Sequence, residues 1–400
     1  MISSCDPART GTMKKTSTGA TVLLLLMLLL AGVLVVRTRH AESTAAQRET
    51  TEAEEPISAV REKNNQHTQL PSETEGMETP SPEETADLMP APDSGQTPEP
   101  AATPHPLRPI CLTDRDLPEE LLLPATHCGT VEEDDYPTRD MVSDVPDRIN
   151  KDVMVYLPYG YDPEEKYDVL VLLHCAWADH RFWLGQDRNY GTEAQPVPVA
   201  VPNLLDRMIE EGYCRPLIVV SPCIYLYDRQ PSRAGNGYDY SQFALEFGKD
   251  FLPWVVENYA TWAADGERET LKAAREHFGV LGASFGAYAA YASVIGDNFD
   301  TAAWYTFCGG GEIDPGYLTN TWTQRGTDDL PLKMLYICEG EYDDRAGPEM
   351  SYTWLRNAGG AFGEENVRFT LVNGWGHEDH SYLVGLFNTL QMFFRDESAA

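Results

Sequence analysis

The stretch Phe278-Gly-Val-Leu-Gly282-Ala-Ser284-Phe-Gly286 decides the fold of this chain. Residues 278–281 form a short apolar run of strand length, and residues 285–295 are small and apolar, as in a closely packed helix. Between them stands G-x-S-x-G in a strand–turn–helix setting. Glycines on both sides of the serine leave room for a sharp turn. The turn raises the Ser284 hydroxyl above the sheet, near the positive end of the helix. Ser284 is therefore a candidate nucleophile, and the alternative is a plain glycine turn.

Strands and helices alternate on both sides of this stretch. Continuous apolar strands separated by helical segments predict an α/β fold, with a mostly parallel sheet and helices on both faces. In such a sheet the chemistry lies at the carboxyl ends of the strands. The predicted strands are residues 152–157, 167–173, 216–220, 278–281, 302–307, 332–338 and 367–372, and the predicted helices are 202–211, 241–259, 285–295, 348–356 and 381–394.

A serine nucleophile needs a general base, and His377 is the candidate. In folds of this kind the order along the chain is Ser, then Asp or Glu, then His. Two histidines follow Ser284, and His377 lies in Gly374-Trp-Gly-His377, between the last strand and the last helix. His380 is the alternative, and we interpret it as a surface or helix-capping histidine.

The imidazole in turn needs an orienting acid. The strand before the histidine strand ends in Glu339-Gly-Glu341-Tyr-Asp343-Asp344. A carboxylate that leaves this strand end can reach the imidazole, so Asp343 is the candidate acid. Asp344 and then Glu341 are the alternative candidates for the acid. The other interpretation is that these acidic residues form a solvated loop with no catalytic role.

An oxyanion formed during acyl transfer needs two backbone N–H donors, one after the nucleophile and one in the loop after an early strand. Phe285 supplies the first. The second is expected in His174-Cys-Ala-Trp177, with Ala176 preferred and Cys175 next. This chemistry requires no metal ion and no organic cofactor.

Aromatic residues gather in the loops at the same sheet edge. Trp177, Tyr225 and Trp375 are the candidate substrate-binding residues, because aromatic rings stack on a sugar or on a phenolic acyl group. The alternative is that these rings only pack the loops. Few basic residues accompany them, which disfavours a strongly anionic substrate such as a phosphate ester.

Charge is distributed unevenly along the 400 residues, whose formal net charge is −33. Residues 1–40 carry five basic and one acidic side chain, and residues 41–106 carry fourteen acidic and three basic ones. The remaining residues 107–400 therefore carry −26. Nucleic acids and anionic membrane surfaces attract positive charge, so neither is an expected partner of the folded part.

The amino end predicts export and divides the chain into three parts. Residues 1–40 contain an uncharged, mostly apolar run at 16–36 between basic flanks, which indicates a signal peptide or an uncleaved signal anchor. Residues 41–106 are rich in Pro, Thr and Glu and contain no Phe, Trp or Tyr, so we expect a disordered linker. Residues 107–400 are the expected folded domain. Its predicted location is extracellular, secreted or membrane-anchored, with membrane contact only if the segment is not cleaved.

Eight cysteines show no C-x-x-C spacing, so neither a zinc ribbon nor a redox motif is indicated. Cys175, Cys308 and Cys338 lie in or beside apolar runs and are expected to be buried. Cys111 and Cys128 form the one pair considered for a disulfide.

With these motifs placed, residues 148–394 resemble the α/β-hydrolase esterases related to feruloyl esterases, acetyl xylan esterases and esterase D. The segments that carry the resemblance are MVYLPYGY at 154–161, KYDVLVLLH at 166–174, PLIVVSP at 216–222, GASFG at 282–286 and GWGH at 374–377. The resemblance implies an α/β-hydrolase fold and a triad of Ser284, Asp343 and His377. The sequence departs from the usual pattern in two places. Cys175 replaces the glycine after His174, and around the serine motif the usual small residues become Ala283 and the bulky Phe285, with Ala287 in place of a second glycine.

The sequence therefore predicts a serine esterase. The resemblance implies feruloyl or acetyl groups on plant cell-wall polysaccharide as the substrate. Two other classes stay open: an acyltransferase or peptidase on the same fold, and a non-catalytic carbohydrate-binding module.

Overall fold

The computed structural model describes residues 106–141, 148–226, 241–310, 314–324, 330–343 and 348–395. The predicted signal or anchor segment, the linker up to residue 105, and Asp344 lie outside the described residues. Within the described ranges no helix combines the length and the apolar character needed to span a membrane.

The core of the molecule is an eight-stranded sheet with the order β1-β2-β6-β3-β7-β8-β9-β10. Strands β3, β6, β7, β8, β9 and β10 pair in parallel, and β2 is antiparallel to both β1 and β6. The strands are β1 (Thr130–Arg139), β2 (Arg148–Leu157), β3 (Asp168–Leu173), β6 (Leu217–Pro222), β7 (Phe278–Ala283), β8 (Trp304–Cys308), β9 (Met334–Gly340) and β10 (Val367–Val372), with β4 (Arg188–Asn189) and β5 (Pro198–Val199) forming a separate pair.

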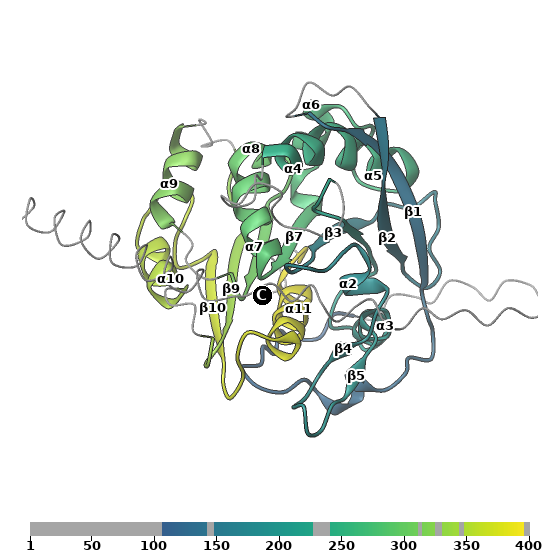
Figure 1. Cartoon of the computed structure of the whole chain (residues 1–400), viewed down its shortest axis with the longest axis vertical. Coiled ribbons are helices and arrows are strands. Elements are labelled where there is room, and N and C mark those ends of the chain that lie inside the picture. The colour runs from purple at the N-terminus through teal and green to yellow at the C-terminus, as the bar shows by residue number, and fades with distance from the viewer. Residues whose placement is uncertain are drawn as a thin grey trace, which may run out of the picture. The chain divides into compact units, whose positions relative to one another are not determined.

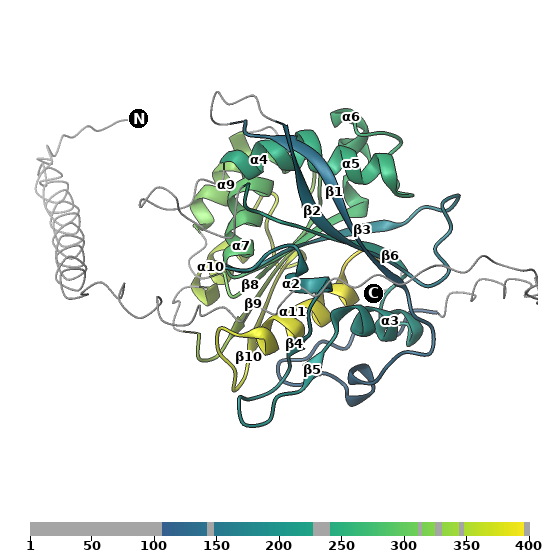
Figure 2. The ribbon, with the colours of Figure 1, turned by 45° about the vertical axis from the view of Figure 1, so that its right-hand side comes forward.

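Helices cover both faces of the sheet (Figures 1 and 2). One face carries α2 (Arg181–Leu184), α3 (Val201–Glu210) and α11 (Asp379–Met392). The other face carries α4 (Ser241–Glu246), α5 (Leu252–Asn258), α6 (Arg268–Ala273), α7 (Phe285–Ala289), α8 (Gly296–Asn298), α9 (Pro315–Gln324) and α10 (Pro348–Arg356). A π-helical turn at Phe247–Phe251 joins α4 to α5, and another at Ala290–Ile295 joins α7 to α8.

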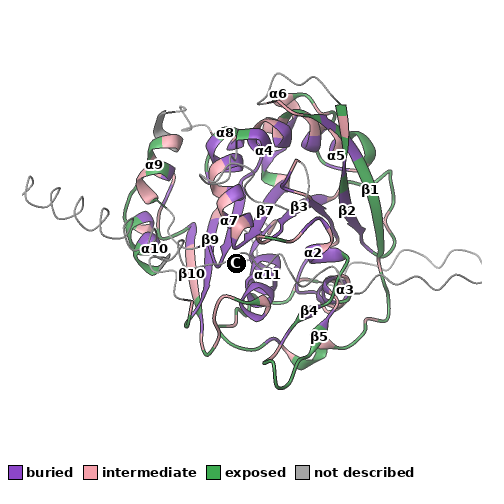
Figure 3. Cartoon of the chain, in the orientation of Figure 1, coloured by how far each residue is buried: buried purple, intermediate pink, exposed green. Residues whose placement is uncertain are grey.

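The two faces are filled by alternate residues of the same strands, because successive side chains of a strand point to opposite sides. In β3, Val169 and Val171 pack with the helices of one face, whereas Leu170 and Leu172 pack with those of the other. All six residues of β3 are buried. The central strands and α11 are accordingly the most buried elements in Figure 3. The predicted mostly parallel sheet with helices on both faces is confirmed.

Strand β1 was not predicted from the sequence. It reads TVEEDDYPTR, and its first six residues are exposed. An edge strand with one free side lacks the continuous apolar run that marked the central strands, and charges and proline on such an edge oppose pairing with other chains. Its partner β2, buried from Val153 onward, carried the apolar signal that the sequence analysis detected.

Candidate active site

The turn after β7 holds Ser284 in a strained conformation. Its φ is 53° and its ψ is −113°, and its N–H donates to the Cys308 oxygen at 2.7 Å. The close approach depends on Gly286, because a Cβ there would lie 2.3 Å from the Leu173 oxygen. Strain of this kind costs about 1–3 kcal/mol and is stored at functional sites. The backbone therefore presents the Ser284 side chain at the carboxyl end of β7.

Three side chains that are distant in the sequence meet at this point. The Ser284 Oγ lies 2.8 Å from the His377 Nε2, and the His377 Nδ1 lies 2.5 Å from the Asp343 Oδ2. Both contacts are of hydrogen-bond length. With Asp343 as acceptor, Nδ1 carries the proton and Nε2 is free to accept from the hydroxyl. The structure thus brings together the three residues that the sequence selected.

The surroundings of His377 hold its ring beside Asp343. The Asp343 side chain is fully buried at the ion pair, whereas the His377 side chain remains 21% exposed. Gly309 is the residue after β8, has a φ of 59°, and lies close to the His377 ring. A Cβ at this position would lie 2.9 Å from the His377 Nδ1. A larger residue would therefore displace the imidazole from Asp343. Partial exposure leaves the ring reachable by substrate and by water.

A second carboxyl group, Glu339, lies beside the triad. It is 3% exposed, and its carboxylate lies with Asp343 and His377 in a group whose ligand atoms are all within 4.8 Å of one another. Such a group has the residue types that hold a divalent cation. Both nitrogens of His377 are already engaged by Ser284 and Asp343, so a cation bound here would compete with the triad hydrogen bonds.

The loop after β3 is held in place by His174, a residue to which the sequence analysis assigned no role. The ring is fully buried. Its Nε2 accepts from the Ile224 N–H at 2.9 Å, and its Nδ1 lies 2.8 Å from the Cys175 oxygen, to which it donates. Burial lowers the pKa of His174 to about 4. A neutral imidazole therefore fixes the carbonyl that begins the candidate oxyanion loop.

The amides of that loop are partly used within the structure. The Trp177 N–H donates to the Tyr225 hydroxyl at 3.2 Å, and the Ala178 N–H donates to the Cys175 oxygen at 3.4 Å. Phe285 is the first residue of α7, directly after Ser284. The assignment of the oxyanion donors to the Phe285 and Ala176 amides, with Cys175 next, remains a prediction.

The three candidate substrate-binding residues have different environments. Trp177 is 69% exposed and has a φ of 65°. Tyr225 is 3% exposed, and its ring lies 5.3 Å from Phe285 and 5.0 Å from His174 between centroids. Tyr225 therefore supports the Trp177 backbone from beneath, whereas Trp177 presents its ring to solvent.

Trp375 is half-buried and ends a stack of three rings. Its ring lies 3.5 Å from that of His380, which in turn lies 4.1 Å from Tyr190. His380 is 1% exposed, and its Nε2 hydrogen-bonds to the Arg115 oxygen at 3.0 Å. The interpretation of His380 as a surface or capping histidine is wrong, because the rings of Trp375 and Tyr190 and the backbone at Arg115 cover it. Its packing supports Trp375 and the loop that carries His377.

The cysteines considered for a disulfide, Cys111 and Cys128, are both exposed and free. Cys308 and Cys338 are buried as expected, and Cys175 is half-buried. Burial raises the pKa of the Cys175 thiol to about 11, so this thiol is a poor nucleophile at neutral pH despite its place beside the active site.

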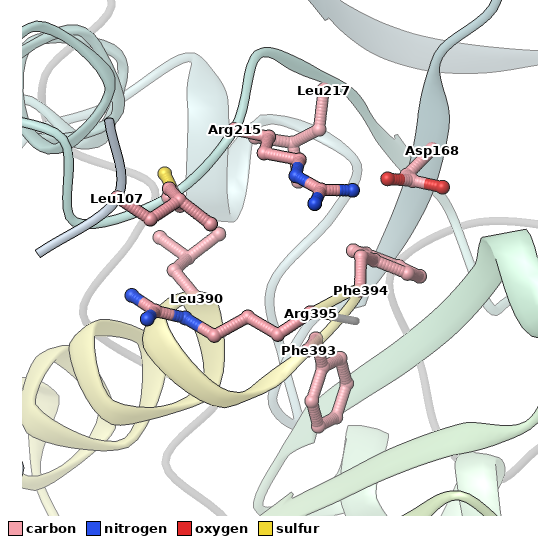
Figure 4. Close-up of a pocket in the computed structure, with 9 residues that line it drawn as sticks. Leu107, Asp168, Arg215, Leu217, Leu390, Phe393, Phe394 and Arg395 are labelled. Atoms are coloured by element: carbon pink, nitrogen blue, oxygen red, sulfur yellow. The ribbon is translucent and has the colours of Figure 1, made fainter. Parts of the chain in front are cut away.

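A small pocket lies away from the triad (Figure 4). Its lining includes Asp168 and Leu217, the first residues of β3 and β6, whereas Ser284 follows the last residue of β7. Because these strands are parallel, the pocket and the triad are at opposite ends of the sheet. The remaining lining residues are Leu107, Cys214, Arg215, Leu390, Phe393, Phe394 and Arg395.

The burial of His174 predicts a specific pH dependence of stability. The folded-state pKa of about 4 lies below the ordinary value of 6.5, so the unfolded chain binds the proton more readily. Stability from this residue is complete above pH 6.5 and is lost as the pH falls toward 4. We expect the free energy of unfolding to drop by about 2 kcal/mol more between pH 7 and pH 5 in wild type than in His174→Asn. Urea unfolding at both pH values measures this difference, and equal drops would contradict the neutral buried imidazole.

The sheet order and the geometry at its carboxyl edge define the α/β-hydrolase fold with a Ser–His–Asp arrangement. No family model matches the chain. Its similarity to solved structures confirms the predicted fold: the feruloyl esterase module from Clostridium thermocellum, in a serine-to-alanine mutant complexed with sinapinate, is 21% identical with a TM-score of 0.56. This match covers 74% of this chain and 97% of that one.

The chain is also similar to two further proteins. A ferulic acid esterase of the CE1 group from the anaerobic fungus Anaeromyces mucronatus is 17% identical with a TM-score of 0.52, over 72% of this chain and 98% of that one. Among curated sequences, endo-1,4-beta-xylanase Y of Acetivibrio thermocellus is 28% identical over 172 residues. That match spans 43% of this chain and 13% of the xylanase. The resemblance to feruloyl esterases found in the sequence is thus confirmed at the level of the fold.

Proposed function

We propose that this protein is a serine esterase that hydrolyses acyl esters, feruloyl or acetyl, of plant cell-wall polysaccharide. The observation that carries the proposal is the continuous contact from the Ser284 Oγ to the His377 Nε2 at 2.8 Å and from the His377 Nδ1 to the Asp343 Oδ2 at 2.5 Å. A serine hydroxyl becomes a nucleophile when an oriented base can take its proton.

In the first half of the reaction, the Ser284 oxygen attacks the ester carbonyl carbon while the His377 Nε2 takes the hydroxyl proton. The resulting imidazolium is stabilised by Asp343, which also holds the ring orientation. As the tetrahedral intermediate collapses, the bond to the alkoxy oxygen breaks and His377 delivers the proton to the leaving alcohol. General acid–base catalysis of this kind contributes about 10²–10⁴-fold.

In the second half, water attacks the acyl-serine. His377 again accepts a proton, this time from the water, and returns it to the Ser284 oxygen as the carboxylic acid leaves. The negative charge on the carbonyl oxygen in both halves is assigned to the amides of Phe285 and Ala176. The His174 contact with the Cys175 oxygen orients the second of these amides in advance, which reduces the reorganisation needed during reaction.

The proposed substrate class is supported by two independent facts. Structures similar to this chain are named feruloyl and ferulic acid esterases, two of them bound to sinapinate and to ferulic acid. In addition, residues 107–400 carry a net charge of −26, which suits an uncharged acyl-sugar better than an anionic ester.

A polysaccharide substrate lies outside the cell, in keeping with the predicted amino-terminal segment. We propose that residues 1–40 direct export or anchor the protein, that residues 41–106 are a flexible linker, and that residues 107–400 are the esterase domain. The acidic, proline-rich linker would keep the domain extended away from a membrane.

Product analysis tests the proposal. The full chain is incubated with feruloylated and with acetylated xylo-oligosaccharides, with and without an added alcohol, and the products are identified by mass. Free ferulate or acetate is the expected product. Acyl transfer to the alcohol in preference to water would instead identify a transferase.

A further inference from the structure

Two aromatic side chains at the active-site edge are far more exposed than their counterparts elsewhere. Trp177 is 69% exposed and Tyr342 is 70% exposed, against 43% for Trp262 and 49% for Trp354. Trp and Tyr are enriched at binding interfaces, because each combines a large apolar ring with a polar group. Trp177 is one of the predicted substrate-binding residues, whereas Tyr342 was not selected from the sequence.

The sheet order places these two residues on opposite sides of the nucleophile. Trp177 follows β3, which pairs with β7 on one side, and Tyr342 follows β9, which is separated from β7 by β8 on the other side. Ser284, at the end of β7, thus lies between them. Three strand spacings of about 4.8 Å separate β3 from β9, or about 14 Å in all. That span is longer than an ester group, so the two rings can contact parts of a substrate beyond the reacting bond.

The backbone of Trp177 is held in a conformation that a tryptophan rarely adopts. Its φ of 65° lies in the left-handed region that favours glycine. The Tyr225 hydroxyl accepts its N–H at 3.2 Å, and the buried Tyr225 ring packs against Phe285, the residue after the nucleophile. Because the Trp177 side chain is exposed, burial in the core does not offset the strain of its backbone. The Trp177 backbone is therefore held near Ser284, and its exposed indole is available to a ligand.

Tyr342 is fixed to the triad in a similar way. Its N–H donates to the Trp375 oxygen at 2.9 Å, and the next residue, Asp343, donates its N–H to the Gly340 oxygen at 3.1 Å. These bonds tie the turn after β9 to the loop that carries His377. The Tyr342 backbone is thus held in place while its phenol ring extends into solvent.

We propose that Trp177 and Tyr342 are two stacking platforms that bind neutral sugar rings of the polysaccharide on either side of the esterified sugar. The proposal rests on the proposed function and specifies its substrate. A residue that bound only a small acyl group would be enclosed in the site. A polysaccharide chain instead extends from the site into solvent in two directions, and the two exposed rings lie on opposite sides of the nucleophile. The acidic domain repels glycans rich in carboxylates, so the rings are those of neutral sugars such as pentoses.

Variants with matched controls test the proposal. Trp177→Ala and Tyr342→Ala remove the platforms. Trp262→Ala and Tyr159→Ala remove exposed rings away from the carboxyl edge of the sheet, where Trp262 stacks on His277 and Tyr159 makes a tilted contact with His127. The substrates are p-nitrophenyl acetate, which has no sugar, methyl ferulate, which has the acyl group alone, and a feruloylated arabinoxylo-oligosaccharide. The same oligosaccharide without ferulate serves as a competitive inhibitor of p-nitrophenyl acetate hydrolysis.

Each platform variant should lower kcat/KM for the feruloylated oligosaccharide about tenfold more than it lowers kcat/KM for either sugar-free ester, mainly through KM. The unesterified oligosaccharide should inhibit wild type and both controls more strongly than the platform variants. Equal losses on all three esters, or inhibition that does not change in the platform variants, would overturn the platforms. If wild type cleaves p-nitrophenyl acetate but neither feruloyl ester and the inhibition still depends on the platforms, the acyl group proposed under the function is wrong while the sugar site stands.

Discussion

Replacing Ser284 by alanine should lower kcat for ester hydrolysis by about 10⁴- to 10⁶-fold, because the proposed nucleophile is lost while the proposed oxyanion donors remain. The variant should keep the wild-type circular dichroism spectrum and melting temperature. Alanine differs from serine by one oxygen and meets the same strain at the φ of 53°. Initial rates with p-nitrophenyl acetate and labelling by a fluorophosphonate probe measure the effect.

Ser293 provides the matched control. It is buried in the π-helical turn that follows α7, and its replacement by alanine should leave both the rate and the labelling near the wild-type level. Labelling of Ser284→Ala at the same level as wild type would mean that another residue is the nucleophile. Absence of labelling in the wild type itself would favour a carbohydrate-binding module that does not catalyse a reaction.

The second large effect is expected at His377. His377→Ala should reduce kcat by about 10⁴-fold or more, because the variant loses the imidazole whose Nε2 lies 2.8 Å from the Ser284 Oγ. His380→Phe should retain the wild-type rate within about tenfold, because phenylalanine preserves the ring stack between Trp375 and Tyr190. Turnover of p-nitrophenyl acetate at pH 7.5 distinguishes the two histidines.

The contrast between the two variants is informative in either direction. A strong loss in His380→Phe with an active His377→Ala would show that the base was assigned to the wrong histidine. Thermal unfolding of both proteins separates catalysis from stability, since His380→Phe also loses the hydrogen bond to the Arg115 oxygen. A lower melting temperature with preserved activity is the expected result for that variant.

Apolar runs predicted most of the sheet because the central strands are buried on both faces. Strand β10 has the predicted bounds, and β3 differs from its prediction by one residue at the start. The exposed edge strand β1 escaped detection, since its sequence contains four consecutive acidic residues and a proline. Helix α9 also went unpredicted. Its residues PGYLTNTWTQ begin with proline and glycine and show weak helical patterning.

Local sequence also selected Ser284, Asp343 and His377, because the order of the residues and the strand ends that carry them limit the choice. It did not reveal the burial of His380, since neither the contact with Tyr190 nor that with Arg115 comes from adjacent sequence. The role of His174 was hidden for the same reason. Its partner Ile224 belongs to the loop after another strand.

The sequence alone determined the class of fold and the candidate residues of the site, because strand periodicity, the glycines around the serine and the order of the acid and the base are local properties of the chain. Tertiary structure decided which side chains are accessible. Parallel pairing brings the carboxyl ends of β3, β7, β9 and β10 to one edge of the sheet. At that edge Tyr225 is buried and supports its neighbours, whereas the rings of Trp177 and Tyr342 are exposed. Burial depends on neighbours supplied by distant segments, and no local pattern contains that information.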